Sequence, residues 1–398
     1  MHVVADALAT AHRAGAGQRD ALGVLGGHLE VVYGALVAFA IVMLLTPAVG
    51  GMARLLGVVD RPDSRRINPR PIPRLGGLAL FFGMIVPSLA FLHLGRETRG
   101  LLLGACVATL VGAVDDFRGL NWSLKLAGQV GAAAIPPAFG IWVDHFTLPL
   151  VGVYSLPQWV GIALTVLWIV ALMNMVNFLD GLDGLAAGVC GIAGLTFAVI
   201  ALSLGKPEAA VVSAVVFGAC LGFLRHNFYP ARIFMGDSGA LLLGFTLATV
   251  SVQGLLKTAA TVALFFPLVV LLIPIFDTSF VIAKRLKHGV PITAPDKAHL
   301  HHRFLNIGYS QRRTAVTMYV WCLTLAGAAL ATRFIPFRAH GHWHTWPTVA
   351  VGVIAGIALA VSLFIVYVLE IVKLANPRIR RREAERREAE LQRGRRSA

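Results

Sequence analysis

The sequence predicts an all-α polytopic integral membrane protein with about 11 transmembrane helices. Of its 398 residues, 57% are hydrophobic and 14% are charged, and the mean hydropathy is +0.74. A soluble domain of this length does not normally reach such values. Apolar runs of about 20 residues, long enough to cross a bilayer core of about 30 Å, recur along the whole chain. The recurrence excludes a soluble domain on a single membrane anchor.

The apolar runs, taken in order, place the helices near residues 43, 84, 106, 133, 166, 195, 216, 246, 270, 323 and 359. No small-residue cleavage pattern follows the first run, so we expect a retained helix and no signal peptide. These boundaries divide the chain into an extracytoplasmic N-terminal segment (1–30), a transmembrane domain (31–373) and a basic cytoplasmic tail (374–398). The Arg/Glu spacing of the tail is typical of a solvated or membrane-surface helix.

Basic residues orient the predicted helices. If the tail is cytoplasmic, an odd number of helices places the N-terminus outside, and 27 of the 35 Lys and Arg residues then lie inside. The same orientation places the Asp-rich motifs and a His cluster on the cytoplasmic face, which favours one shared site there. The net charge of +15 lies in loops and tail, so it indicates membrane topology and anionic phosphate partners, and no nucleic acid.

The first motif is an acidic pair at the end of one predicted helix. Asp115 and Asp116 close this helix, and Lys125 opens the next. Adjacent carboxylates repel each other, so a cation or a proton must relieve them. The alternative is a solvated helix end, although carboxylates at membrane depth are costly and tend to be functional.

The second motif is N-F-L-D-G-L-D-G, in which Asn177, Asp180 and Asp183 are three residues apart. On a helix this spacing keeps the three polar side chains near one face, and the glycines remove bulk beside them. The pattern suits close approach of a phosphate or a nucleotide. A helix C-terminus with turn residues is the alternative.

The third motif is F-M-G-D-S-G, in which Asp237 precedes a long apolar helix. Asp at a helix start is often only an N-cap, and taken alone this motif favours that interpretation. Asp237 could equally give Mg²⁺ a hard oxygen ligand. Phe234 is available to stack on a flat base, although an aromatic residue at a membrane interface is usually an anchor.

The fourth motif lies in the longest hydrophilic loop between apolar runs. The loop is rich in cationic and His side chains: Lys297, His299, His301, His302, Arg303, Arg312 and Arg313. Without Cys or Glu nearby these His residues resemble a zinc site only weakly, so we expect a cationic cradle for a diphosphate. A basic, proline-rich connection at 61–74 is explained by topology, or by binding of anionic lipid headgroups or the substrate phosphate. Gly76 and Gly77, which follow it, permit close helix approach.

In this order the four motifs closely resemble the polyprenyl-phosphate N-acetylhexosamine-1-phosphate transferase superfamily, over about residues 61–313. The form H-L-H-H at 299–302 looks like the H-I-H-H of its WecA/TagO-like GlcNAc-1-phosphate branch. Enzymes of the phospho-MurNAc-pentapeptide branch typically carry three consecutive His and a Lys soon after the Asp pair. Eleven spans also fit the GlcNAc branch better.

The resemblance implies a reaction and a location. A sugar-1-phosphate moves from a UDP-N-acetylhexosamine, most often UDP-GlcNAc, to a polyprenyl phosphate, and UMP is released. The resemblance also implies Mg²⁺, with Mn²⁺ as a substitute, and a bacterial cytoplasmic membrane with the site facing the cytoplasm. Membrane lipids are expected partners, and a homodimer is compatible with the pattern.

The resemblance also assigns roles to residues. Asp237 is the principal metal ligand, with Asp180 and Asp183 beside it. Asp115 is a base or orients the nucleophile, and Asp116 assists near the lipid phosphate. The remaining expected contacts are with the nucleotide, the uracil and the diphosphate: Asn177, Lys125, Phe234, His299, His301, His302 and Arg303.

Two other classes compete with a transferase. A transporter or flippase for an anionic lipid or sugar phosphate would also use intramembrane carboxylates, but it predicts polar groups near the midplane and internal repeats, which are not evident. A structural scaffold that binds polyanions leaves the Asp motifs unexplained. The sequence has no P-loop, dinucleotide fingerprint or serine nucleophile elbow.

Overall fold

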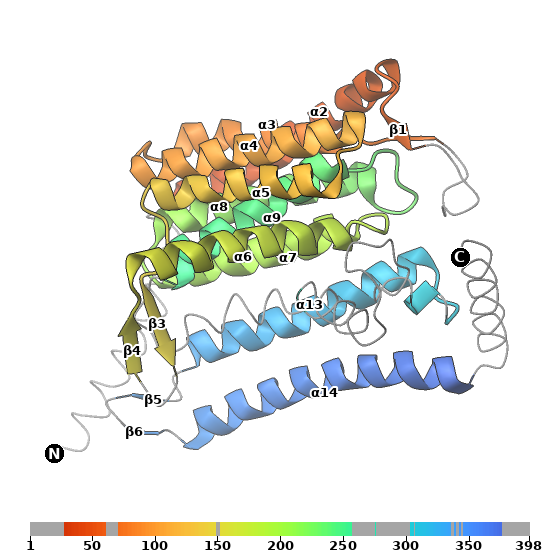
Figure 1. Ribbon diagram of the computed structural model, residues 1–398. Helices are drawn as coiled ribbons and strands as arrows, with labels where there is room; N and C mark the ends of the chain where they lie inside the picture. The colour runs from red at the N-terminus through yellow and green to blue at the C-terminus, as the bar shows by residue number, and fades with distance from the viewer. Residues whose placement is uncertain are drawn as a thin grey trace, which may run out of the picture.

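The computed structural model describes residues 28–60, 71–148, 152–256, 303–305, 307–335 and 345–375, together with Ile275 and two short strands at 338–339 and 342–343. Ten α-helices run through these residues (Figure 1): α2 (Leu29–Leu55), α3 (Gly76–Phe91), α4 (Arg96–Arg118), α5 (Trp122–Ala138), α6 (Gln158–Leu179), α7 (Leu185–Ser203), α8 (Pro207–Asn227), α9 (Gly236–Val250), α13 (Gln311–Phe334) and α14 (Thr345–Ala375). A π-helix, η1 (Ser251–Leu256), directly continues α9.

Ten of the predicted spans coincide with these helices, and the span near residue 270 lies outside the described residues, as do residues 1–27 and 376–398. Seven of the described helices are long and apolar enough to cross a membrane: α2, α4, α6, α7, α8, α13 and α14. Helices α3, α5 and α9 are shorter, with 16, 17 and 15 residues. The predicted class, a helical polytopic membrane protein, is confirmed, whereas the number of 11 spans stays a prediction.

Three antiparallel hairpins mark the two ends of the bundle. Strand β1 (Val59–Asp60) pairs with β2 (Ile72–Pro73), β3 (His145–Leu148) with β4 (Gly152–Ser155), and β5 (Arg338–Ala339) with β6 (His342–Trp343). Figure 1 places β1 at one end of the helices and the other labelled strands at the opposite end. We call these ends the β1 end and the β3 end.

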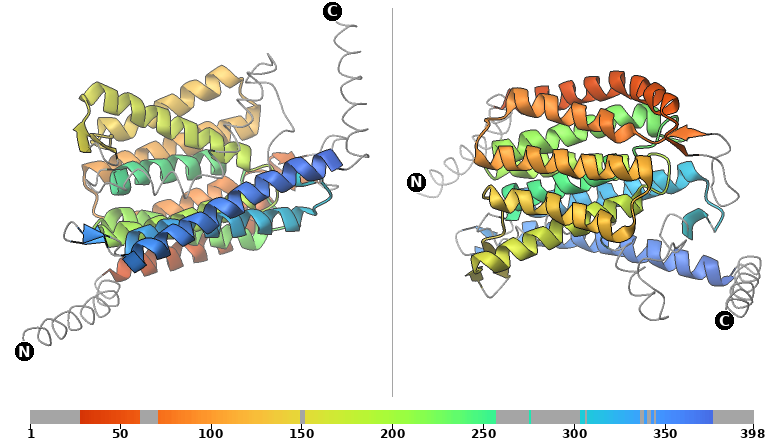
Figure 2. Two further views of the ribbon diagram at one scale, coloured as in Figure 1. Left: turned by 90° about the horizontal axis from the view of Figure 1, so that it is seen from below. Right: turned by 45° about the horizontal axis from the view of Figure 1, so that its top comes forward.

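Helix α9 is the centre of the bundle. It contacts α3, α4, α5, α6, α7 and α8, and the views in Figure 2 show it enclosed by its neighbours. All of its residues are buried except Asp237, which is partly exposed. A helix that is apolar on every side is stable only inside a protein or a membrane, so the composition of α9 accounts for its position.

Glycines let the neighbouring helices approach α9 closely. A Cβ added at Gly112 of α4 would lie 2.5 Å from the carbonyl group of Asp237, and one at Gly77 of α3 would collide with the backbone of Ser238 and Gly239. Small residues at such contacts allow the close helix packing typical of membrane proteins. The predicted close approach of the 76–77 segment is therefore confirmed for Gly77.

Replacing Gly112 by Ala should destabilise the bundle by about 1–3 kcal/mol, because the added methyl group has no space against the α9 backbone. The matched control is Gly131→Ala on α5, where a Cβ would have no atom within 4 Å. Thermal unfolding of the two detergent-solubilised variants, followed by helical circular dichroism, measures the difference. Equal midpoints would show that α4 and α9 are not packed this closely.

Candidate active site

Four helix ends that carry predicted site residues meet at the β1 end. Helices α4 and α6 end there, and α5 and α9 begin there. Hydrogen bonds between side chains on these ends join residues up to 122 positions apart in the sequence. The structure therefore brings the first three motifs together.

A tight turn brings Asp115 and Lys125 close to each other. Gly119 adopts a left-handed conformation (φ 66°) and ends α4, while the Asn121 side chain accepts a hydrogen bond from the Leu124 amide at 2.8 Å and so caps the start of α5. The Leu120 amide donates to Asp115 Oδ1 at 2.6 Å. The reversal within three residues places the acidic end of one helix beside the basic start of the next.

The Lys125 ammonium is the central cation of the site. Its Nζ lies 2.8 Å from Asp115 Oδ2 and 2.6 Å from Asp237 Oδ2. The other oxygen of Asp237 accepts a hydrogen bond from Asn177 Nδ2 at 2.6 Å. The side chains of Asp115, Lys125 and Asp237 are 9%, 19% and 19% exposed, so these charge-assisted contacts are only partly solvated.

Asp116 caps the central helix. Its Oδ1 accepts from the Asp237 amide at 2.9 Å, and its Oδ2 accepts from the amide and hydroxyl of Ser238 at 3.0 and 2.9 Å. Its side chain is fully buried, and Arg74 Nη2 lies 3.9 Å from Oδ1. The N-terminal N–H groups of a helix need partners, and here a carboxylate from another helix supplies them.

This cap bears on two interpretations made from the sequence, and it changes the first. Asp237 is the second residue of α9 and not its cap, because its own amide is the group that Asp116 caps. The carboxylate of Asp237 is thus free to face Lys125 and Asn177. The buried oxygens of Asp116 contact the backbone of α9 and the Ser238 hydroxyl, and its expected place near the lipid phosphate stays a prediction.

Asp180 adds a further carboxylate at the end of α6. It interacts electrostatically with Asp237, Arg74 and Asp116, and burial together with the charge of Asp237 raises its pKa well above the usual range. Four carboxylates (Asp115, Asp116, Asp180 and Asp237) thus surround two cations, Arg74 and Lys125. With two cations for four carboxyl groups, full ionisation of this cluster of described residues is unfavourable, and a further bound cation would stabilise it.

A second network fixes the loops that carry these groups. Asn227 Oδ1 accepts from the Gly184 amide at 3.0 Å, and Asn227 Nδ2 donates to the Ile233 carbonyl at 2.9 Å. The Tyr319 hydroxyl of α13 donates to the Gly184 carbonyl at 2.6 Å. Asp183, only 4% exposed, accepts from the Ala231 amide at 2.9 Å. The α6–α7 turn and the α8–α9 loop are therefore tied to each other and to α13.

The remaining predicted residues lie at the same end or outside the described chain. The Phe234 amide donates to the Pro73 carbonyl at 2.8 Å, so this partly exposed side chain stands beside β2. Arg303, also partly exposed, begins a short helical turn. His299, His301 and His302 lie outside the described residues.

The donor chemistry of the site fits Mg²⁺. Within the described part of the chain, no three His, Cys, Asp or Glu groups form a ready-made metal cluster. Mg²⁺ does not need one, because it is usually held by one or two carboxylates together with waters and substrate phosphates. Asp237 and Asp180 supply such oxygens in a cluster where carboxyl groups outnumber cations. Asp183 is buried, at 4% exposed, and its Oδ2 already accepts from the Ala231 amide, so it is less accessible than the partly exposed Asp180 and Asp237.

Four residues of the site were not predicted to act there: Arg74, Asn227, Ser238 and Tyr319. Ser238 is part of the third motif, and Asn227 precedes it. A polar residue at the end of an apolar run could have indicated Asn227. Arg74 lies in the basic 61–74 connection, for which topology, anionic headgroups and the substrate phosphate were all left open, and it had no role of its own. Tyr319 lies inside an apolar run, where nothing distinguishes it from a packing residue, and only its position across from Gly184 reveals its contact.

Comparison with known proteins agrees with this geometry. Residues 98–255, which extend from α4 to η1, match the model of glycosyl transferase family 4. A "Probable undecaprenyl-phosphate N-acetylglucosaminyl 1-phosphate transferase" of Bacillus subtilis is 39% identical over 294 residues, which cover 73% of this chain and 82% of that protein. A "Decaprenyl-phosphate N-acetylglucosaminephosphotransferase" of Mycobacterium tuberculosis is 35% identical over 360 residues, which cover 80% of this chain and 89% of that protein.

The second branch is more distant. A "Phospho-N-acetylmuramoyl-pentapeptide-transferase" of Desulforudis audaxviator is 31% identical over 334 residues, 76% of this chain and 98% of that protein. The two GlcNAc-1-phosphate transferases are more similar to this chain than the pentapeptide transferase is. This agrees with the GlcNAc branch that the H-L-H-H form indicates. By motif order, site geometry and similarity, this chain belongs to glycosyl transferase family 4, among the polyprenyl-phosphate N-acetylglucosamine-1-phosphate transferases.

Proposed function

We propose that this protein transfers N-acetylglucosamine-1-phosphate from UDP-N-acetylglucosamine to a polyprenyl phosphate and releases UMP. The observation that carries the proposal is the meeting of Asp115, Lys125, Asn177 and Asp237 at one end of the bundle, in a chain of this family. The product, a polyprenyl-diphospho-sugar, would start a lipid-linked cell-envelope polymer.

The reaction exchanges one phosphorus–oxygen bond for another. An oxygen of the lipid phosphate forms a bond to the sugar-bearing phosphorus of the donor, and the bond from that phosphorus to the bridging oxygen breaks. The bridging oxygen leaves with UMP. Two anions must approach each other, so the site has to neutralise charge, align the attack and exclude water.

Lys125 and Arg74 are the cations within the carboxylate cluster that can neutralise phosphate oxygens. Asp115 holds Lys125 and orients it, and a lipid phosphate that is already largely ionised near neutral pH needs no strong base. Asn177 fixes the rotamer of Asp237 through its hydrogen bond. Asp116 acts as a positioning residue through the α9 N-terminus.

Asp237 and Asp180 would hold Mg²⁺, for which Mn²⁺ can substitute, and the bound ion would neutralise diphosphate charge. Phe234 is suited to stack on the uracil, while His299, His301, His302 and Arg303 would hold the diphosphate. The uracil and the diphosphate are the parts of the donor that the lipid acceptor, which carries a single phosphate, lacks.

The distribution of basic residues supports a cytoplasmic site. The described Lys and Arg residues divide between the ends of the bundle, with five at the β3 end (Arg96, Arg99, Lys206, Arg333 and Arg338) and ten at the β1 end (Arg54, Arg74, Arg118, Lys125, Arg225, Arg232, Arg303, Arg312, Arg313 and Lys373). Short cytoplasmic loops are enriched in Lys and Arg. We therefore assign the β1 end to the cytoplasm, in a bacterial cytoplasmic membrane.

Purified protein with Mg²⁺, polyprenyl phosphate and radiolabelled UDP-GlcNAc should form labelled lipid and UMP in equal amounts. A parallel reaction with UDP-MurNAc-pentapeptide should give no product. Product formed only from the peptide-bearing donor would assign the chain to the other branch. Loss of turnover on chelation, restored by Mg²⁺ or Mn²⁺, tests the metal separately from the choice of donor.

Asp237→Asn should lower turnover by about 100-fold or more, because the amide cannot hold a metal ion or neutralise Lys125 as the carboxylate does. The matched control is Glu30→Gln, which removes a carboxylate paired with His28 near the start of α2, at the other end of this helix from the site. Steady-state rates at saturating donor and acceptor measure the effect. Full activity in folded Asp237→Asn would remove Asp237 from the metal site.

Tyr319→Phe should lower kcat by about 3- to 10-fold with little change in the donor KM, because one partly buried hydrogen bond that positions the α6–α7 turn is lost. Tyr33→Phe, at an exposed position of α2, is the matched control. Measuring kcat and KM beside the unfolding midpoint separates positioning from stability. A lower midpoint with an unchanged kcat would limit Tyr319 to a structural role.

A further inference from the structure

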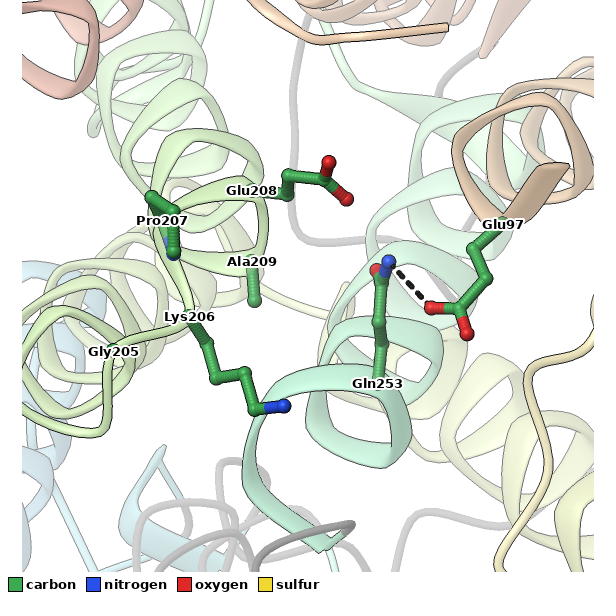
Figure 3. A pocket seen from close by; sticks show the side chains of 7 residues that line it. All are labelled: Glu97, Gly205, Lys206, Pro207, Glu208, Ala209 and Gln253. Carbon is green, nitrogen blue, oxygen red and sulfur yellow. Dashed lines mark hydrogen bonds between the residues drawn. The ribbon is translucent and has the colours of Figure 1, made fainter. Parts of the chain in front are cut away.

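A second polar pocket lies at the β3 end, away from the active site. It has a volume of about 240 Å³ and lies between the first turn of α4, the turn between α7 and α8, and the π-helix η1 (Figure 3). Helix α7 begins beside Asp183 and ends at Ser203, whose carbonyl accepts from Arg333 of α13 at 2.6 Å. The pocket is therefore separated from the phosphate site by the full length of α7.

The wall formed by η1 is rigidly built. Gln253 is 8% exposed and donates from Nε2 to Glu97 Oε2 at 3.0 Å. A Cβ at Gly254 would lie 2.5 Å from the Cβ of Ala209, so η1 and the start of α8 are in close contact. A π-helix is rare, and it occurs frequently at functional sites. Here it holds the Gln253 amide against Glu97 on one side of the pocket.

The opposite side of the pocket attracts an anion. Lys206 precedes α8, and its ammonium extends toward Gln253 in Figure 3 without a hydrogen bond or ion pair to any residue in the described part of the chain. The N-terminus of a helix carries partial positive charge, so a cation there is unfavourable unless an anion binds between them. An oxygen-rich anionic group can satisfy both the ammonium and the first amides of α8.

The same pocket also attracts a cation. Glu97 lines it from α4 and Glu208 lines it from α8, and the two carboxylates outnumber the single ammonium. A ligand with negative charge alone would therefore be repelled by the pocket as a whole. A primary ammonium is suited to donate hydrogen bonds to the carboxylates while an attached anionic group faces Lys206.

We propose that this pocket binds a small zwitterion that carries a phosphate and a primary ammonium, the chemistry of a phosphoethanolamine headgroup. Three helices that can cross a membrane border the pocket at their ends, which places it at the depth of lipid headgroups. The phosphate faces Lys206 and the ammonium faces Glu97 and Glu208. A glycerol headgroup lacks the ammonium, and a choline headgroup has no N–H to donate.

Native mass spectrometry of the full chain tests the proposal independently of transferase activity. The protein is prepared in detergent with equal amounts of phosphatidylethanolamine, phosphatidylglycerol and phosphatidylcholine, and the retained lipids are counted. We expect preferential retention of phosphatidylethanolamine, reduced about two- to fivefold in Lys206→Ala and in Glu208→Gln. The matched control, His93→Asn, changes an exposed residue outside the pocket in the α3–α4 connection and should retain lipid like the unaltered protein.

Each outcome has a definite meaning. Equal retention of the three lipids, or retention of phosphatidylethanolamine that is unchanged in folded Lys206→Ala and Glu208→Gln, overturns the proposal. Soluble phosphoethanolamine is added as a competitor to identify the source of the ligand. If it displaces the lipid, the pocket recognises the free headgroup; if it does not, while the variants still lose lipid, the site requires the membrane-bound form.

Discussion

The cap that Asp116 places on α9 is the contact on which the site depends. Helix α9 is enclosed by six other helices, so its N-terminal amides have little access to water, and an unsatisfied amide in such surroundings costs several kcal/mol. A carboxylate from α4 satisfies the amides of Asp237 and Ser238. Gly112 makes the contact possible, because any larger residue would separate the two helices at this point.

The cap also sets the charge of the site. Because Asp116 takes over the end of α9, the carboxylate of Asp237 is released to face Lys125 and Asn177. Asp115, the neighbour of Asp116 in sequence, contacts Lys125 from the other side. The two members of the acidic pair thus have different tasks: Asp116 positions a helix, and Asp115 holds a cation. Four carboxyl groups still face two cations here, so the proposed Mg²⁺ would supply the positive charge that a polyanionic substrate needs.

The two ends of the bundle differ in chemistry for a physical reason. At the β1 end, carboxylates and cations are joined in a dense network that holds loops from distant parts of the chain. At the β3 end, the pocket has fewer contacts, and the Lys206 ammonium has no partner in the described chain. A reaction needs fixed geometry, whereas a headgroup can itself provide the missing contacts when it binds.

The sequence alone determined the helical membrane class, the place of ten helices and the shared end of three acidic motifs, because hydrophobic length and charge are local properties of a chain. It could not show that Asp116 caps α9 while Asp115 holds Lys125, because the two residues are adjacent and chemically identical. Nor could it identify Tyr319 as the partner of Gly184, 135 positions away. Only the tertiary structure determines these contacts. A hydrogen bond depends on distance and direction in space, and helix packing sets both.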